Sequence, residues 1–84
     1  MMAYLQKIDP NRNMHRFYRA TVAPTLFGEW ALIREWGRIG SPQGQRMEEW
    51  FGVEADARAA MAYVIWAKQG RGYKTGPQSL PQPG

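Results

Sequence analysis

The sequence has no cysteine and only one histidine, His15, among its 84 residues. Disulfides and thiolate metal sites are therefore excluded, and one imidazole cannot assemble a zinc site by itself. No apolar run approaches the roughly 18 residues that a membrane-spanning helix needs. The N-terminus also lacks the basic-then-apolar pattern of a signal peptide. We therefore expect a cytoplasmic protein with no membrane partner and no cofactor.

Acidic residues are also few, and they are unevenly placed. Seven Asp and Glu residues face eleven Lys and Arg residues, for a formal net charge of +4. The acids gather between Glu48 and Asp56, and none follows Asp56. Eight of the eleven basic residues are arginine, the side chain suited to bidentate phosphate contact. This balance favours an anionic partner.

A chain of this length corresponds to one small domain, whose core must be filled with large side chains. The sequence supplies them, with four Trp, four Tyr, three Phe and five Met. After Gly72 the composition changes to Gly, Pro, Gln and Ser with one leucine, which is too little apolar surface to fold. We expect residues 1–76 to form the domain and residues 77–84 to be a disordered tail.

Four segments predict β-strands because aromatic and β-branched residues alternate in them between turn residues. Pro24 should end the second strand, since proline cannot donate to the ladder. The third strand carries apolar residues on both faces and should be central, although periodicity does not assign its core face. The fourth should be half-buried. The expected strands are Tyr4–Ile8, at an edge, then Met14–Ala23, Glu29–Ile39 and Gln45–Phe51.

Residues 54–69 predict a helix, with Glu54 and Asp56 complementing its positive end and Gly70 as its stop. Tyr63 and Trp66 should extend its apolar stripe into the core. The main stripe consists of Ala57, Ala60, Met61, Val64, Ile65 and Lys68. The expected fold is α+β, a small antiparallel sheet of about four strands packed on one main C-terminal helix.

The third predicted strand holds the most informative segment of the chain. Arg34, Trp36 and Arg38 should point to one face, because side chains in a strand alternate with period two. Gly37 lets another backbone or a ligand approach closely. A flat aromatic ring flanked by guanidinium groups suits a sugar-phosphate chain. The same residues also fit a buried tryptophan beside a glycine bulge, with arginines that solvate a sheet edge.

Further basic and aromatic residues lie before the second strand and after the helix, and such residues make sugar and phosphate contacts. The helix has few charges and does not resemble a recognition helix, which favours recognition of shape or ends over base sequence. The candidate nucleic-acid-binding residues are Asn13, Arg16, Arg34, Trp36, Gly37, Arg38, Tyr73 and Lys74.

The segment Trp36-Gly37-Arg38-Ile39-Gly40 resembles the signature of the WGR domain, which is named for its first three residues. The resemblance continues in order from about Tyr4 to Tyr73. It includes an Asp-x-x-x-Asn segment, an aromatic pair, a Gly-Gln step, an aromatic-ended strand, an alanine-rich helix, a lysine and a Gly-Tyr pair. These features are Asp9 and Asn13, Phe17-Tyr18, Gly44-Gln45, Trp50-Phe51, Lys68 and Gly72-Tyr73.

In poly(ADP-ribose) polymerases the WGR domain contacts DNA at a break, and its tryptophan packs on the sugar of a terminal nucleotide. The resemblance implies that Trp36 stacks on sugar, that Arg38 is a polar clamp or domain contact, and that Gly37 is the spacer. It places Asn13 and Arg16 near a phosphate-contacting turn. The chain resembles short bacterial proteins that are little more than this domain. We therefore expect a non-enzymatic module that binds DNA ends, nicks or junctions.

A second hypothesis is a protein–protein interaction or homodimerisation module that uses the same aromatic and basic face. Steep salt dependence would favour the first hypothesis, because counterions are released from phosphates. No catalytic set supports an enzyme, since Glu48 and Glu49 point to opposite faces of a strand. We also expect Trp30 to be a core residue and Trp36 to be exposed, so that losing Trp36 would cost less stability than losing a core aromatic.

Overall fold

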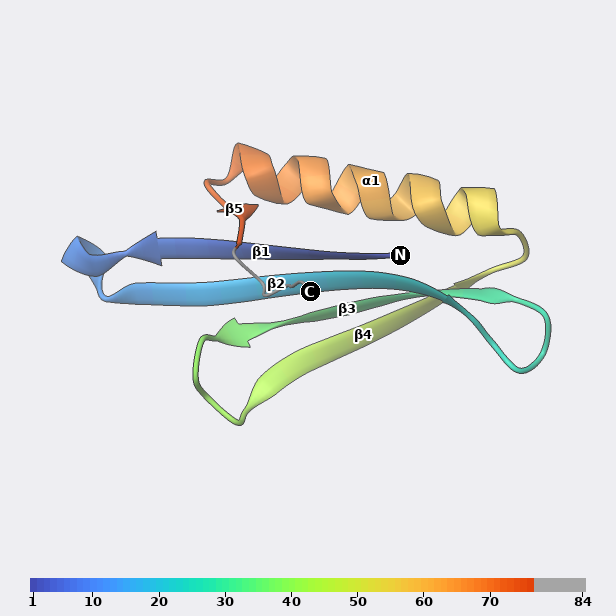
Figure 1. Cartoon of the computed structure of the whole chain (residues 1–84), viewed down its shortest axis with the longest axis horizontal. Helices are drawn as coiled ribbons and strands as arrows, with labels where there is room; N and C mark the ends of the chain where they lie inside the picture. The colour runs from blue at the N-terminus through green and yellow to red at the C-terminus, as the bar shows by residue number, and fades with distance from the viewer. Residues whose placement is uncertain (77–84) are drawn as a thin grey trace, which may run out of the picture.

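The computed structural model describes residues 1–76 of the 84-residue chain, and in them a single helix packs against one face of an antiparallel sheet (Figure 1). The strand order is β4-β3-β2-β1-β5. The α+β prediction is confirmed, and the predicted tail, residues 77–84, lies outside the described residues. The elements are β1 (Met2–Asp9), the 3-10 helix η1 (Pro10–Arg12), β2 (Met14–Pro24), β3 (Trp30–Arg38), β4 (Gly44–Phe51), α1 (Glu54–Gly70) and β5 (Lys74–Thr75).

The fifth strand is the addition to the predicted sheet, and it depends on the turn after the helix. Gly72 has φ +99°, a conformation that glycine adopts without the steric cost of a side chain. The chain reverses there, and the Tyr73 N–H donates to the Lys68 carbonyl at 3.1 Å. β5 then pairs with β1 at Leu5 and Gln6, so the expectation that the first strand lies at an edge is wrong. Two residues are too few for a strand pattern to be visible in the sequence.

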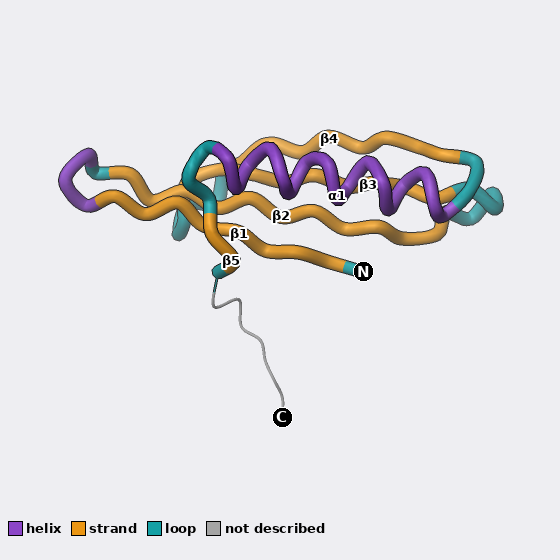
Figure 2. Tube along the Cα trace, turned by 90° about the horizontal axis from the view of Figure 1, so that it is seen from above, coloured by secondary structure: helices purple, strands orange, loops and turns teal. Residues whose placement is uncertain are grey.

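The core lies between α1 and one face of the sheet, and β2 and β3 form its centre. Residues directly opposite each other on antiparallel strands share a face. Tyr18 lies opposite both Leu5 and Trp36, and Val22 lies opposite Leu32. Figure 2 shows α1 running along the strands above them. The buried cluster consists of Leu5, Tyr18, Ala20, Val22, Leu32, Ala57, Met61 and Tyr73.

Two expectations about burial are wrong. Tyr63 and Trp66 are 67% and 68% exposed, and their rings pack on each other at 5.9 Å instead of entering the core. One helix on a sheet buries only a narrow stripe, and these two side chains lie outside it. β4 is also not half-buried: residues 44–50 are exposed, because β4 is the outermost strand on its side of the sheet.

The face of the sheet away from α1 is not covered by any other element of residues 1–76. Tyr4 and Phe17 stack on this face with ring centroids 6.1 Å apart. At the turn between β2 and β3, Leu26 is 98% exposed and Phe27 is 77% exposed. No helix in the described part of the chain is long and apolar enough to span a bilayer.

Candidate nucleic-acid interface

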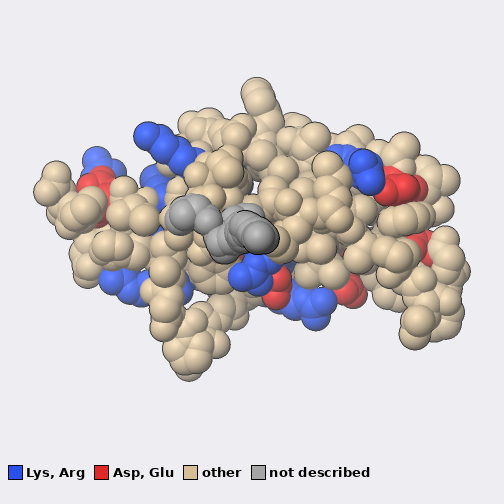
Figure 3. All heavy atoms as spheres, in the orientation of Figure 1, with Lys and Arg blue, Asp and Glu red and all other residues tan. Residues whose placement is uncertain are grey.

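Six cationic side chains come together where α1 ends, and we call them the basic cluster. Lys7, Arg16 and Arg38 form a row across three neighbouring strands, because Arg16 pairs with Lys7 of β1 and with Arg38 of β3. Figure 3 shows Lys and Arg side chains at this end of the molecule, on the left. Lys68 joins the row, because its pKa is lowered by burial and also by the charges of Arg71, Arg34, Arg16 and Lys7. The full cluster is Lys7, Arg16, Arg34, Arg38, Lys68 and Arg71.

The basic cluster differs from the other arginines in its lack of acidic partners. Among residues 1–76, none of its six members forms an ion pair. The four ion pairs in that part of the chain are Arg12–Asp9 at 3.5 Å, Arg19–Glu35 at 3.1 Å, Arg46–Glu48 at 3.2 Å and Arg58–Glu54 at 2.8 Å. The positive charge of the cluster is therefore available to an anion.

The pKa of Lys68 shows the effect of the neighbouring positive charges. It is lowered from the ordinary value, first by burial and then by the charges of Arg71, Arg34, Arg16 and Lys7. Because the unfolded chain holds this proton more tightly, the protonated form of Lys68 destabilises the fold at neutral pH. Stability rises with pH only between the lowered pKa and the ordinary value of 10.5. A bound anion would oppose the electrostatic part of this destabilisation.

Aromatic rings pack beneath the basic cluster. Tyr18 stacks on Trp36 with centroids 5.9 Å apart and meets Tyr73 edge-on at 6.4 Å. The Lys68 Nζ lies 4.8 Å from the centre of the Tyr18 ring and 5.4 Å from that of Tyr73. Burial raises the pKa of Tyr18, and Arg34 opposes this change. These cation–π contacts hold Lys68 over the sheet.

A small cavity opens at the row of cations, next to Tyr73 in the segment that follows the helix. Arg16, Trp36, Gly37, Arg38 and Tyr73 line it, and its volume is about 170 Å³. All five were predicted from the sequence as binding residues. Pockets for drug-sized ligands have volumes of about 300–1,000 Å³, so this cavity suits a single sugar or phosphate group.

Arg38 is held in place by the turn that joins β1 to β2. Its Nη1 donates to the Asn13 carbonyl and its Nη2 to the Asn13 Oδ1, both at 3.2 Å. Asn13 has φ +51°, a left-handed conformation that asparagine tolerates better than most residues. The Ile39 N–H also donates to the His15 carbonyl at 2.8 Å. Asn13 thus positions Arg38, and a direct phosphate contact of Asn13 stays a prediction.

Gly37 lies where the chain's own backbone approaches it closely. A Cβ at Gly37 would lie 3.2 Å from the Gly44 Cα, 3.3 Å from the Gln43 carbonyl oxygen and 3.4 Å from the Phe17 ring. These atoms belong to the turn into β4 and to the face away from α1. A side chain here would displace the turn that continues from the site into β4.

Comparison with known proteins identifies the family. The sequence model of the WGR domain family matches residues 1–79. The chain belongs to the WGR domain family. This domain is generally a nucleic-acid-binding module and not a catalytic one. The chain is also 44% identical over 79 residues to the uncharacterized protein y4dW of Sinorhizobium fredii, covering 94% of this chain and 38% of that protein. The chain therefore spans less than half the length of this relative.

Trp36 of this WGR domain is not the freely exposed platform that the sequence suggested. It is partly buried, packs against the core and stacks on Tyr18. Both interpretations of the signature therefore contribute, because one side of the ring is packed while the residue still lines the cavity. Trp30 is also partly buried and packs against the core.

Replacing Trp36 by Ala should lower the free energy of unfolding by about 2–3 kcal/mol, somewhat less than for a fully buried aromatic. The control is Trp66→Ala, which removes an equally large ring that is 68% exposed and should change stability by no more than about 0.5 kcal/mol. Thermal melting monitored by circular dichroism measures both. Equal losses would show that the burial of Trp36 contributes nothing.

Like Asn13, the predicted residues Arg34 and Lys74 do not line the cavity. Arg34 shares the face of Trp36, lies against the Met47 sulfur, and has a buried Nε without a hydrogen-bond partner in residues 1–76. Lys74 lies opposite Gln6 of β1 and so on the face away from α1. Arg34 therefore adds charge to the basic cluster, whereas Lys74 does not join it.

Sequence reasoning missed Lys7, Lys68 and Arg71 as members of the site. The first two carried a signal, since Lys7 is two residues from Leu5 and so lies on the same face of β1, and Lys68 falls on the apolar stripe of the helix. The missing information was that β1 and the end of α1 meet beside Arg16. Only the strand register and the helix position supply it.

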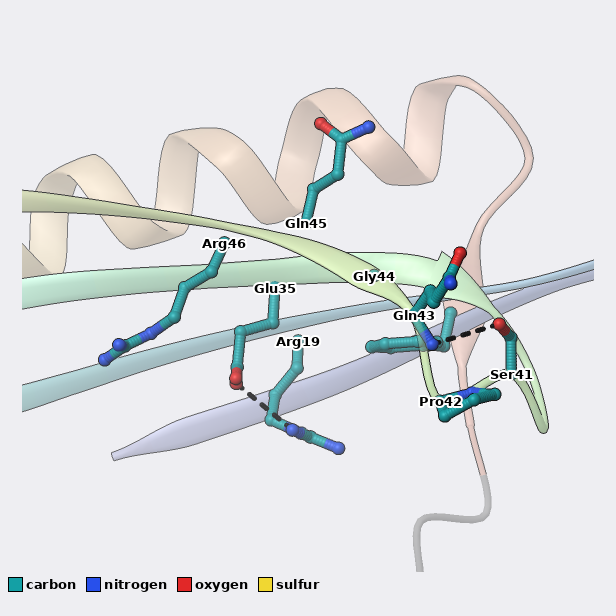
Figure 4. A pocket seen from close by; sticks show the side chains of 9 residues that line it. Arg19, Glu35, Ser41, Pro42, Gln43, Gly44, Gln45 and Arg46 are labelled. Atoms are coloured by element: carbon teal, nitrogen blue, oxygen red, sulfur yellow. Dashed lines mark hydrogen bonds and ion pairs between the residues drawn. The ribbon is translucent and has the colours of Figure 1, made fainter.

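A larger cavity of about 260 Å³ lies on the other face of the sheet, beneath the turn between β3 and β4 (Figure 4). Its two central charges, Arg19 and Glu35, form an ion pair at 3.1 Å. Arg46 at its rim is paired with Glu48. Because these cations are already neutralised, this cavity is less suited to phosphate than the basic cluster.

Proposed function

We propose that this WGR domain binds DNA through sugar-phosphate contacts at the basic cluster and prefers ends, nicks or junctions. The observation that carries the proposal is the set of six cations without acidic partners in residues 1–76, two of which line a cavity together with Trp36 and Tyr73. The nucleic-acid-binding character of the family supports it. A DNA partner also agrees with the cytoplasmic location expected from the sequence.

The row of cations has the dimensions of a short stretch of phosphates. Neighbouring strands lie about 4.8 Å apart, so the row from Lys7 through Arg16 to Arg38 spans about 10 Å. Phosphates on one DNA strand follow each other at about 3.4 Å along the helix axis. A nucleic-acid strand crossing the β-strands would meet the three cations in turn, with the cavity beside it.

The shape of the site favours a strand end over an internal position. The cavity is small and Trp36 is packed on one side, so the contact offered is one sugar and not a run of stacked bases. A terminal sugar has a nucleotide neighbour on one side only and enters such a cavity with less hindrance. α1 has no basic outward face that could enter a DNA groove, since its outward side chains include Tyr63 and Trp66.

Competition binding tests the proposal. A fluorescently labelled nicked duplex is bound at low salt, and unlabelled nicked, blunt-ended and covalently closed circular DNA of one sequence compete for the domain. We expect micromolar binding or somewhat tighter, and at least about tenfold weaker competition by the closed circle, which is about 1.4 kcal/mol. Equal competition would refute the preference for ends. Direct binding of the labelled duplex is also measured at a second, higher salt concentration, and an affinity that does not fall there would refute the phosphate contacts.

A further inference from the structure

β4 has an open edge that is unusual in its length and regularity. It pairs with β3 in one unbroken register from Phe51 opposite Trp30 to Gly44 opposite Gly37. Its other edge has no partner strand in residues 1–76. β4 has eight residues, whereas strands most often have about five or six, and residues 44–50 are all exposed.

Most of the devices that usually protect an edge strand are absent from β4, which does carry the charged residues Arg46, Glu48 and Glu49. Folded proteins block such edges with proline, lysine, bulges or a covering element. β4 contains no proline or lysine, and its pairing has no bulge. The opposite side of the sheet ends in β5, which has two residues, one of them Lys74. Within the described chain, β4 is therefore the better template for another strand.

The charges of β4 are self-complementary. Arg46 and Glu48 point to the same face and form an ion pair at 3.2 Å within the chain. We propose that β4 pairs antiparallel with β4 of a second copy, with Met47 on the two-fold axis. In this register Arg46 of each copy lies opposite Glu48 of the other, so four charges alternate in sign along and across the two strands.

The alternation of side chains limits the possible registers. A two-fold axis normal to the sheet keeps the two faces of both copies aligned, and it must then pass beside one residue that lies opposite its own copy. The possible registers are therefore named by that central residue. Centring the axis on Glu48 places Glu48 opposite itself, and centring it on Arg46 does the same for Arg46. Like charges directly opposite each other are destabilising. Met47 is the centre that pairs opposite charges twice.

Such a dimer is a separate property from the proposed DNA binding, but it has a consequence for it. The axis keeps both α1 helices and both basic clusters on one face. Arg34 lies opposite Met47, so the two copies of Arg34 would be three strand spacings apart, about 14 Å. Two binding sites on one face would let a single DNA molecule contact both copies.

Charge reversal followed by mixing tests the dimer without DNA. Analytical ultracentrifugation compares the full chain with Arg46→Glu, with Glu48→Arg, and with an equimolar mixture of the two variants. Each variant alone places like charges opposite each other twice, which should weaken self-association about ten- to a hundredfold. In the mixture, all four charges are complementary again, so a heterodimer should form with the affinity of the parent. The double variant R46E/E48R should dimerise as the parent does.

Both side chains are exposed, at 58% and 39%, so both variants should fold. Arg46→Glu should melt slightly below the parent, because position 46 lies opposite Glu35 of β3, and circular dichroism checks this. A parent chain that stays monomeric at about 0.5 mM, where a dimer with a Kd of about 1 mM would still be detected, would overturn the proposal. Single variants that dimerise like the parent, or a mixture that stays monomeric, would overturn it as well.

Discussion

Replacing Lys7, Arg16 and Arg38 together by Ala should weaken binding to a nicked duplex by about a hundredfold or more. A hydrogen bond to a charged group is worth about 1.5–3 kcal/mol, and each 1.4 kcal/mol or so is a factor of about ten. The slope of log affinity against log salt should also flatten by about three, because three phosphates are no longer neutralised by the protein. Stability should fall only slightly, because none of the three residues is in an ion pair in residues 1–76 and the hydrogen bonds lost from Arg38 to Asn13 are exposed.

The matched control replaces Arg12, Arg19 and Arg58 by Ala. Both triple variants reduce the formal net charge from +4 to +1, since each removes three cations. The control arginines are held in ion pairs and do not belong to the row of cations, so their loss should cost only a few-fold in affinity. Fluorescence anisotropy at two salt concentrations measures both variants. If the two lose affinity equally, net charge and not the basic cluster determines binding.

Replacing Leu32 by Ala should destabilise the domain more than any of the other substitutions. Leu32 is 0% exposed at the centre of β3, and large-to-small changes at such sites cost about 2–5 kcal/mol. A domain of this size has a total stability of about 4–13 kcal/mol. The melting temperature should therefore fall by about 10–30 °C, or the variant should fail to fold.

Leu26→Ala is the control for Leu32→Ala because it removes the same atoms from a side chain that is 98% exposed. Its effect on stability should stay within about 0.5 kcal/mol. Thermal melts of the two variants side by side make the comparison. A large loss at Leu26 together with a small loss at Leu32 would contradict the assignment of the core to the face beneath α1.

The elements of the fold that have many residues were predictable from the sequence. The four longer strands and the helix follow from alternation, from the turn residues and from the apolar stripe. β5 was not predictable, since two residues carry no period and its pairing depends on the turn at Gly72. The exposure of Trp66 was also not predictable, because periodicity does not say how wide a helix stripe the sheet will cover.

The site was predictable in part for a related reason. The face shared by Trp36 and Arg38 follows from strand alternation alone, and the row of cations that includes Arg16 follows from the register between β2 and β3. Neither strand by itself indicates the register. The sequence also does not indicate that Lys68 of the helix lies at the site. The packing of Trp36 on Tyr18 likewise needs the register, because the two residues are far apart in the chain.

The most direct test of the central claim, that nucleic acid binds at the basic cluster, is an NMR titration of the tryptophan indoles. The four tryptophans each contribute one indole N–H signal, which single Trp→Phe variants assign. Addition of a nicked duplex should shift the signal of Trp36, which lines the cavity, and leave Trp66 on the outer side of α1 unchanged. A saturable shift at Trp66 with an unchanged Trp36 would contradict the claim and place the bound DNA elsewhere on the domain.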